Sequence, residues 1–182
     1  MRLRMEWSVF AGATLTGLTA DSESISFDPK VGWHAGFDMG LLLSRRCAVV
    51  PELIFTHTAV DIKGRTDNVM SVKSNGLELP LLFEYRILRG RLRFYAGPSF
   101  TLMDRNDCSY GGESMDGFRF RPIVTYVVGV RGVIGRRVTV GARFNGRFNR
   151  TEQIMGYNID DPDYETYRMG GRRVSISVGY RF

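Results

Sequence analysis

The chain has 182 residues, a length that suits one domain, and 43% of them are hydrophobic, which argues against disorder. Its 25 basic and 19 acidic residues give a net charge of +6, which suits nucleic acid, anionic lipid or a solvated surface. No run approaches the roughly 18 to 20 apolar residues that a transmembrane helix needs, so this chain would cross a bilayer only with strands. We expect a single domain over residues 1–182.

The first twenty residues have some features of a signal peptide. Arg2 and Arg4 precede an apolar run, but Glu6 and several Thr or Ser residues interrupt the apolar segment that a signal peptide requires. The segment instead alternates with a period of two, with one apolar phase formed by Trp7, Val9, Ala11, Ala13 and Leu15. We therefore predict a strand here, and a mature sequence from which any export signal is missing.

The same alternation recurs along the chain in segments of about ten residues, the length of a tilted strand that crosses a bilayer. In the second segment, one phase is apolar and the other is small or polar: Val31, Trp33, Ala35, Phe37, Met39, Leu41 and Leu43 against Gly32, His34, Gly36, Asp38, Gly40 and Leu42. Clear alternation returns in residues 77–87, 92–102, 137–144 and 174–182. Residues 47–59 and 122–133 alternate less cleanly, because Ile54, Ile123 and Val127 fall on the polar phase. Together these segments predict eight strands.

The connections between these segments alternate strictly between two lengths. Residues 44–46, 88–91 and 132–136 form short turns, whereas residues 17–30, 60–74, 104–121 and 149–171 form long loops. An even number of strands lets an up-and-down meander close with both termini on one side. Short turns at one end and long loops at the other are the asymmetry of outer-membrane barrels, with the turns in the periplasm and the loops outside the cell.

The alternation alone does not say which phase faces outward, since a soluble lipocalin-like barrel has its apolar face inside. Aromatic residues near the strand ends favour a membrane girdle. The other phase carries many glycines and charges of both signs, which suits the crowded lumen of a small barrel. We therefore predict an all-β, eight-stranded, antiparallel transmembrane barrel with a lumen charge network of Glu6, Asp38, Glu52, Glu78, Glu84, Arg86, Arg93, Arg143, Arg147, Arg173 and Arg181.

Two stretches resemble a known family. Leu79-Pro80-Leu81-Leu82-Phe83-Glu84-Tyr85, a short basic turn, and then Phe94-Tyr95-Ala96-Gly97-Pro98 resemble the paired-strand motif of the PorT-like outer-membrane β-barrel family. The last five residues resemble a terminal strand that the barrel-assembly machinery recognises, with Tyr180 and Phe182 as the assembly signal. The resemblance implies the outer membrane of a Gram-negative bacterium and eight strands. It supplies no catalytic residue and says little about the role.

The sequence offers little material for catalysis or for metal binding, and we expect no enzyme activity, no metal and no cofactor. His34 on the inward phase has Asp38 and Glu52 as conceivable partners, and His57 lies near the outer end of its strand, but neither completes a catalytic set. Cys47 beside a turn and Cys108 in a long loop lie at opposite ends of the predicted barrel, too far apart for a disulfide.

The charged and aromatic residues outside the barrel wall suggest its partners. Pairs of arginines at the short turns suit phosphate headgroups of the inner leaflet, and they lack the interleaved aromatics of a nucleic-acid site. We expect lipopolysaccharide at the outer end and a protein partner at the long loops, where tyrosines suit an interface: Tyr110, Tyr157, Tyr164 and Tyr167. The predicted function is a scaffold or interaction protein. The alternatives are a narrow pore and a soluble binding barrel.

Overall fold

The structure is a computed structural model that describes residues 4–20, 26–63, 69–110, 113–115, 124–148, 151–154 and 166–182. The strands in these ranges are β1 (Arg4–Ala20), β2 (Ser26–Pro29), β3 (Val31–Leu42), β4 (Cys47–Lys63), β5 (Val69–Ile87), β6 (Leu92–Tyr110), β7 (Glu113–Met115), β8 (Val124–Ile134), β9 (Val138–Arg147), β10 (Thr151–Ile154) and β11 (Thr166–Arg181). A 3-10 turn, η1 (Leu88–Gly90), joins β5 to β6. Within the described ranges, no helix is long and apolar enough to cross a membrane.

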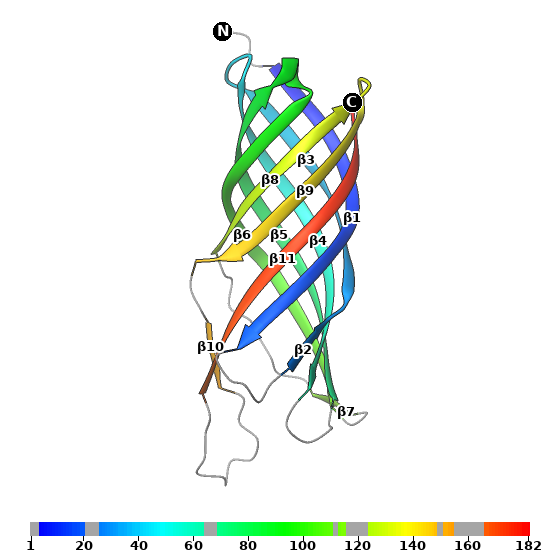
Figure 1. Cartoon of the computed structure of the whole chain (residues 1–182), viewed down its shortest axis with the longest axis vertical. Helices are drawn as coiled ribbons and strands as arrows, with labels where there is room; N and C mark the ends of the chain where they lie inside the picture. The colour runs from blue at the N-terminus through cyan, green and yellow to red at the C-terminus, as the bar shows by residue number, and fades with distance from the viewer. Residues whose placement is uncertain are drawn as a thin grey trace.

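Eight of these strands form a closed antiparallel barrel in the order β1-β3-β4-β5-β6-β8-β9-β11, and pairing between β1 and β11 closes it. The short strands β2, β7 and β10 pair with β4, β6 and β11. The start of β1 and the end of β11 lie at the end of the cylinder where the three short turns are (Figure 1). The eight-stranded up-and-down barrel predicted from the sequence is therefore confirmed.

The wall of the barrel has an apolar outer face and a polar inner face. Side chains of the predicted apolar phase point outward and are exposed, such as Ile176 at 62%, Val178 at 59% and Phe83 at 52%. A soluble binding barrel would place this face inside, whereas a membrane barrel places it against lipid. The predicted orientation is confirmed, and the soluble alternative is set aside.

The two irregular segments place apolar side chains inside the barrel. Ile54 on β4 and Val127 on β8 are buried, and Val127 joins Ala48, Val50, Leu82 and Tyr95 in an apolar cluster in the lumen. The inner face is therefore mixed, with apolar side chains filling space between the charged ones.

The predicted loop boundaries were wrong at the outer end. β4, β5 and β6 continue as paired strands to Lys63, from Val69 and to Tyr110, so much of the predicted loops 60–74 and 104–121 is strand. β1 and β11 also run on, to Ala20 and from Thr166. These extensions lack the apolar alternation because they have no lipid to face, yet their backbones still pair in antiparallel ladders. At the other end, the turn predicted at 132–136 is instead residues 135–137.

Three glycines occupy positions, in two tight turns and at one close approach of strands, that a residue with a side chain would not adopt easily. Gly90 and Gly135 have φ angles of 84° and 65° in the tight turns, a region that disfavours side chains. Gly97 lies where β6 approaches β5, and a Cβ there would lie 2.1 Å from the carbonyl oxygen of Leu81.

Candidate functional site

The middle of the lumen holds a buried ion-pair layer from four strands. Arg131 on β8 donates to Asp38 at 2.8 Å and to Glu52 at 3.0 Å. Arg143 on β9 donates to the other oxygen of Glu52 at 2.8 Å, and the Ser8 hydroxyl donates to Asp38. Glu52 therefore joins two guanidiniums, and charge-assisted bonds of this kind are strong in a buried setting.

Two aromatic rings complete this layer. The guanidinium carbons of Arg131 and Arg143 lie 5.4–5.8 Å from the ring centres of Phe10 and Tyr95, within the range of cation–π attraction. Gly129 leaves room for the Tyr95 ring, because a Cβ there would lie 2.5 Å from its hydroxyl oxygen. We call these six residues, Phe10, Asp38, Glu52, Tyr95, Arg131 and Arg143, the central plug.

A second charged cluster lies between the plug and the short turns. Arg86 bonds Glu84 at 2.7 Å and Glu6 at 3.1 Å, and Arg93 approaches the same two acids at 3.4 Å. Arg181 lies 3.6 Å from Glu6. The cavity left among these side chains has a volume of about 10 Å³, so the periplasmic half of the lumen is filled.

The outer half of the lumen is more open. Arg173 makes a bidentate ion pair with Glu78, in which both nitrogen–oxygen distances are 2.6 Å. This pair borders a cavity of about 120 Å³ toward the outer end, lined by residues of seven barrel strands, including Arg147, Arg172 and Asp104. The outer half of the lumen therefore contains a larger polar cavity, and the central plug separates it from the small inner cavity.

The structure places all eleven predicted network residues along the lumen or around its two cavities. Seven of the eleven are buried, and the other four are partly exposed: Glu6, Arg147, Arg173 and Arg181. The sequence prediction omitted Arg131, Phe10 and Tyr95, which form half of the plug. Arg131 carried a usable signal, since a base in the middle of a membrane strand faces the lumen rather than lipid.

Neither histidine joins a catalytic set. His34 faces the lumen as predicted, but Asp38 and Glu52 bond to other residues, and neither ring nitrogen of His34 has a hydrogen-bond partner in the described part of the chain. His57 lies against Trp33 and bonds Asn75 at 2.7 Å. No cluster of three potential metal-ligating side chains occurs among the described residues.

Some predicted features lie only partly within the described residues. Tyr157 and Tyr164 lie outside them, and Tyr110 on β6 and Tyr167 on β11 are described only by their backbones. Cys47 is a free thiol at the turn end of β4. It pairs with Tyr85 on β5, which pairs in turn with Phe94 on β6, so Cys47 and Phe94 lie at the same level of the barrel. Cys108 lies fourteen residues further along β6, or about 45 Å along the strand. It belongs to a strand and not to the predicted loop, and the backbone separation agrees with the expected lack of a disulfide between them.

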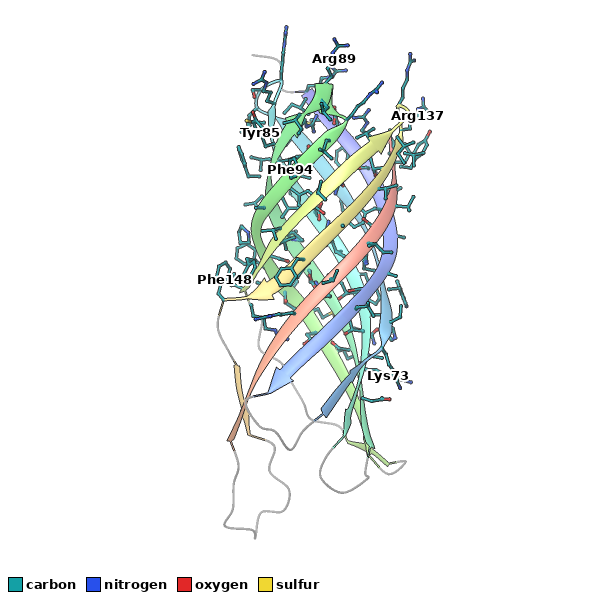
Figure 2. The ribbon with its side chains drawn as sticks, in the orientation of Figure 1. Lys73, Tyr85, Arg89, Phe94, Arg137 and Phe148 are labelled. Carbon is teal, nitrogen blue, oxygen red and sulfur yellow. The ribbon has the colours of Figure 1, made fainter. Side chains whose placement is uncertain are left out.

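The outer surface shows a band of lipid-facing side chains between two rings. Figure 2 shows Tyr85 and Phe94 near the turn end, Phe148 toward the other end, and the bases Arg89, Arg137 and Lys73 beyond these rings. On β5, the outward phase runs from Tyr85 to Asn75, and ten residues of a strand tilted by about 40° rise about 25 Å. This height equals the apolar band of outer-membrane barrels.

The closed barrel, the central plug across its lumen and this lipid-facing band define an outer-membrane β-barrel protein of a Gram-negative bacterium. The chain belongs to the outer membrane protein beta-barrel domain family, whose model matches residues 1–148. No curated protein matches the sequence.

Several solved structures resemble the chain over nearly its whole length. Ail, the attachment invasion locus protein of Yersinia pestis, has 15% identity and a TM-score of 0.61 over 97% of this chain and 98% of Ail. OprG of Pseudomonas aeruginosa has 12% identity and a TM-score of 0.55 over 97% and 95%. The neisserial surface protein NspA has 14% identity and a TM-score of 0.54 over 97% of each chain. At these identities the likeness shows the fold alone.

Proposed function

We propose that the protein is a non-enzymatic scaffold of the outer membrane that presents its outer strands and loops to partners outside the cell. The observation that carries the proposal is the central plug, in which buried ion pairs and two rings close the lumen between its cavities. A solute would have to break several charge-assisted bonds in order to pass, which argues against the pore alternative.

The outer end offers the larger surface for recognition. Beyond the level of His57 and Asn75, β4 and β5 continue for about six more residues. This extends the hairpin roughly 15 Å beyond the outer edge of the apolar band. Segments of this kind on a rigid scaffold commonly carry function. Lys73 lies on this extension and is exposed. We propose Tyr110, Tyr157, Tyr164 and Tyr167 as contacts for a protein partner, and the outer bases as contacts for lipopolysaccharide phosphates.

Two further assignments belong to the same proposal. Tyr180 and Phe182 face outward at the end of the closing strand, a placement that suits recognition by the barrel-assembly machinery. The paired-strand motif supports a narrower place within the family, among PorT-like barrels. Ail is named for attachment and invasion. Adhesion through the outer end is one form that the proposed scaffold function can take.

Single-channel recording in planar bilayers tests the closed lumen. We expect no stable current from the intact protein and a measurable current from the variant Phe10→Ala/Tyr95→Ala, which removes both rings of the plug. The lipid-facing substitution Leu79→Ala serves as the matched control and should stay silent. A stable current from the intact protein that is lost in Arg143→Gln or Glu84→Gln would replace the scaffold by a pore.

Site-specific photo-crosslinking in intact cells tests the outer surface. A photoreactive residue at Lys73 should give a discrete adduct with a second protein, whereas one at the lipid-facing Phe37 should not. The same experiment at Tyr157 and Tyr167 extends the map to the proposed contacts. If no outer position gives an adduct that Phe37 lacks, the barrel does not present a partner-binding surface.

A further inference from the structure

The three short turns share an unusual composition. Each contains two arginines and no acid: Arg45 and Arg46, Arg89 and Arg91, and Arg136 and Arg137. All six are exposed, and Figure 2 shows Arg89 and Arg137 at the turn end of the barrel, beyond the lipid-facing rings. We call these six residues the arginine belt. It places six positive charges at the periplasmic end of a protein whose net charge is +6.

The nearby acids do not neutralise the belt. Glu6 and Glu84 point into the lumen, where Arg86 and Arg93 bind them. In the part of the chain that the structure describes, no carboxylate makes an ion pair with a belt arginine. The belt is therefore an uncompensated positive surface.

Backbone hydrogen bonds hold the belt in place. The carbonyl of Arg46 accepts from the Arg86 amide at 2.7 Å, and the carbonyl of Arg91 accepts from the Val133 amide at the same distance. The carbonyl of Arg137 accepts from the Arg181 amide at 2.8 Å. Each turn is thus fixed to a neighbouring strand, while the guanidinium groups project from a rigid ring.

The belt lies against the inner edge of the lipid-facing band. The Arg137 guanidinium donates to the Tyr180 hydroxyl at 2.6 Å and lies 5.8 Å from the centre of its ring. Tyr85 and Phe94 lie next to the turn that carries Arg89 (Figure 2). Aromatic rings of this kind sit at the level of the headgroups. The arginines therefore meet the headgroup phosphates of the periplasmic leaflet rather than bulk solvent.

We propose that the arginine belt binds anionic glycerophospholipids and gathers them around the periplasmic end of the barrel. Guanidinium groups bind phosphate oxygens in a two-pronged arrangement, and they are more weakly hydrated than ammonium groups. A zwitterionic headgroup cancels its phosphate with its own cation, whereas phosphatidylglycerol keeps its negative charge. The belt therefore selects lipids with net negative charge. This inference rests on the membrane placement and is independent of the role of the outer loops.

The two tryptophans provide built-in reporters for each end. Trp7 lies near the belt, where its carbonyl accepts from the Phe182 amide, and 47% of it is exposed. Trp33 lies toward the outer end, pairs with His57 and is 50% exposed. The variant Trp33→Phe leaves only Trp7, and Trp7→Phe leaves only Trp33. Quenching by lipids brominated on their acyl chains then measures which lipid contacts each end.

The experiment compares brominated phosphatidylglycerol with brominated phosphatidylcholine in mixed vesicles that contain the full chain. We expect about fivefold tighter binding of phosphatidylglycerol at Trp7, with a smaller preference at higher salt because screening shortens the reach of the charges. Replacing all six belt arginines by Gln should abolish the preference. The triple variant Arg45→Gln/Arg89→Gln/Arg136→Gln should reduce it partly, and it gives the answer if the sixfold variant fails to fold.

Two controls identify the source of the preference. Lys73→Gln/Arg105→Gln at the other end should leave the Trp7 result unchanged. Added inorganic phosphate should compete weakly, because a free ion lacks the acyl chains that hold the headgroup at the belt. The proposal is overturned if Trp7 shows no preference for phosphatidylglycerol, or if the preference survives the belt substitutions in a barrel whose folding is shown by its gel mobility.

Discussion

Leu81 offers a direct test of which face of the barrel meets lipid. It lies on β5, points outward and is 47% exposed. Four residues separate it from Tyr85 at the inner edge, and six separate it from Asn75 at the outer edge. A strand tilted by about 40° therefore places it about 10 Å from the inner edge of a band about 25 Å high, close to the middle of the bilayer.

The substitution Leu81→Arg has a depth-dependent cost. An arginine at the midplane of a transmembrane barrel destabilises the fold by about 2–4 kcal/mol, and one near an interface by about 0–1 kcal/mol. Tyr85→Arg on the same strand and the same face is the matched control, because its side chain lies at the inner ring. We therefore expect a difference of about 1–4 kcal/mol between the two variants.

Urea unfolding in phospholipid vesicles measures this difference, since folded and unfolded outer-membrane barrels migrate differently on gels of unboiled samples. The unfolding midpoint of Leu81→Arg should fall well below that of Tyr85→Arg. Equal midpoints would mean that Leu81 does not face the bilayer core. A larger loss for Tyr85→Arg would place the membrane at a different height on the barrel.

Two further substitutions test the lumen and the wall. Glu52→Gln leaves the buried Arg131 and Arg143 without their shared carboxylate, so it should destabilise the barrel by about 3–5 kcal/mol in urea unfolding; an unchanged midpoint would show that the plug is not closed by ion pairs. Gly97→Ala puts a methyl group against a backbone oxygen and should cost about 1–3 kcal/mol or more. Gly132→Ala is its control, since a Cβ there would lie 3.8 Å from the carbonyl oxygen of Val140, and similar losses for both would contradict the close approach.

The sequence was sufficient to predict the part of the fold that the bilayer constrains. Lipid outside and a narrow lumen inside impose a strict period of two, so the faces of β3, β5 and β11 follow directly from their residues. Beyond the bilayer this constraint ends. Residues 70–74 on β5 and 106–110 on β6 pair through their backbones, which places little demand on their side chains, and the predicted loops were therefore too long.

The sequence predicted which charged residues line the lumen better than it predicted how they pair. Charges on the inward phase had to lie in the lumen, and they do. Which acid meets which arginine depends on barrel closure, since Glu52 and Arg143 are 91 residues apart in the chain. The rings of Phe10 and Tyr95 were not predicted as part of the plug, because an aromatic residue on the polar phase becomes informative only when the opposite strands are known.

The long separations of these pairs suggest that the lumen network also specifies how the barrel closes. Glu78 on β5 and Arg173 on β11 are 95 residues apart and meet across the lumen. A one-residue slip of either strand would turn its charge toward lipid, which is unfavourable. We therefore expect Glu78→Arg and Arg173→Glu to lose the fast-migrating folded form, because each places two like charges together. The double exchange Glu78→Arg/Arg173→Glu restores the opposite charges and should recover folding. If the double variant folds no better than the single ones, the pair contributes only local packing, and register is set by the apolar outer face alone.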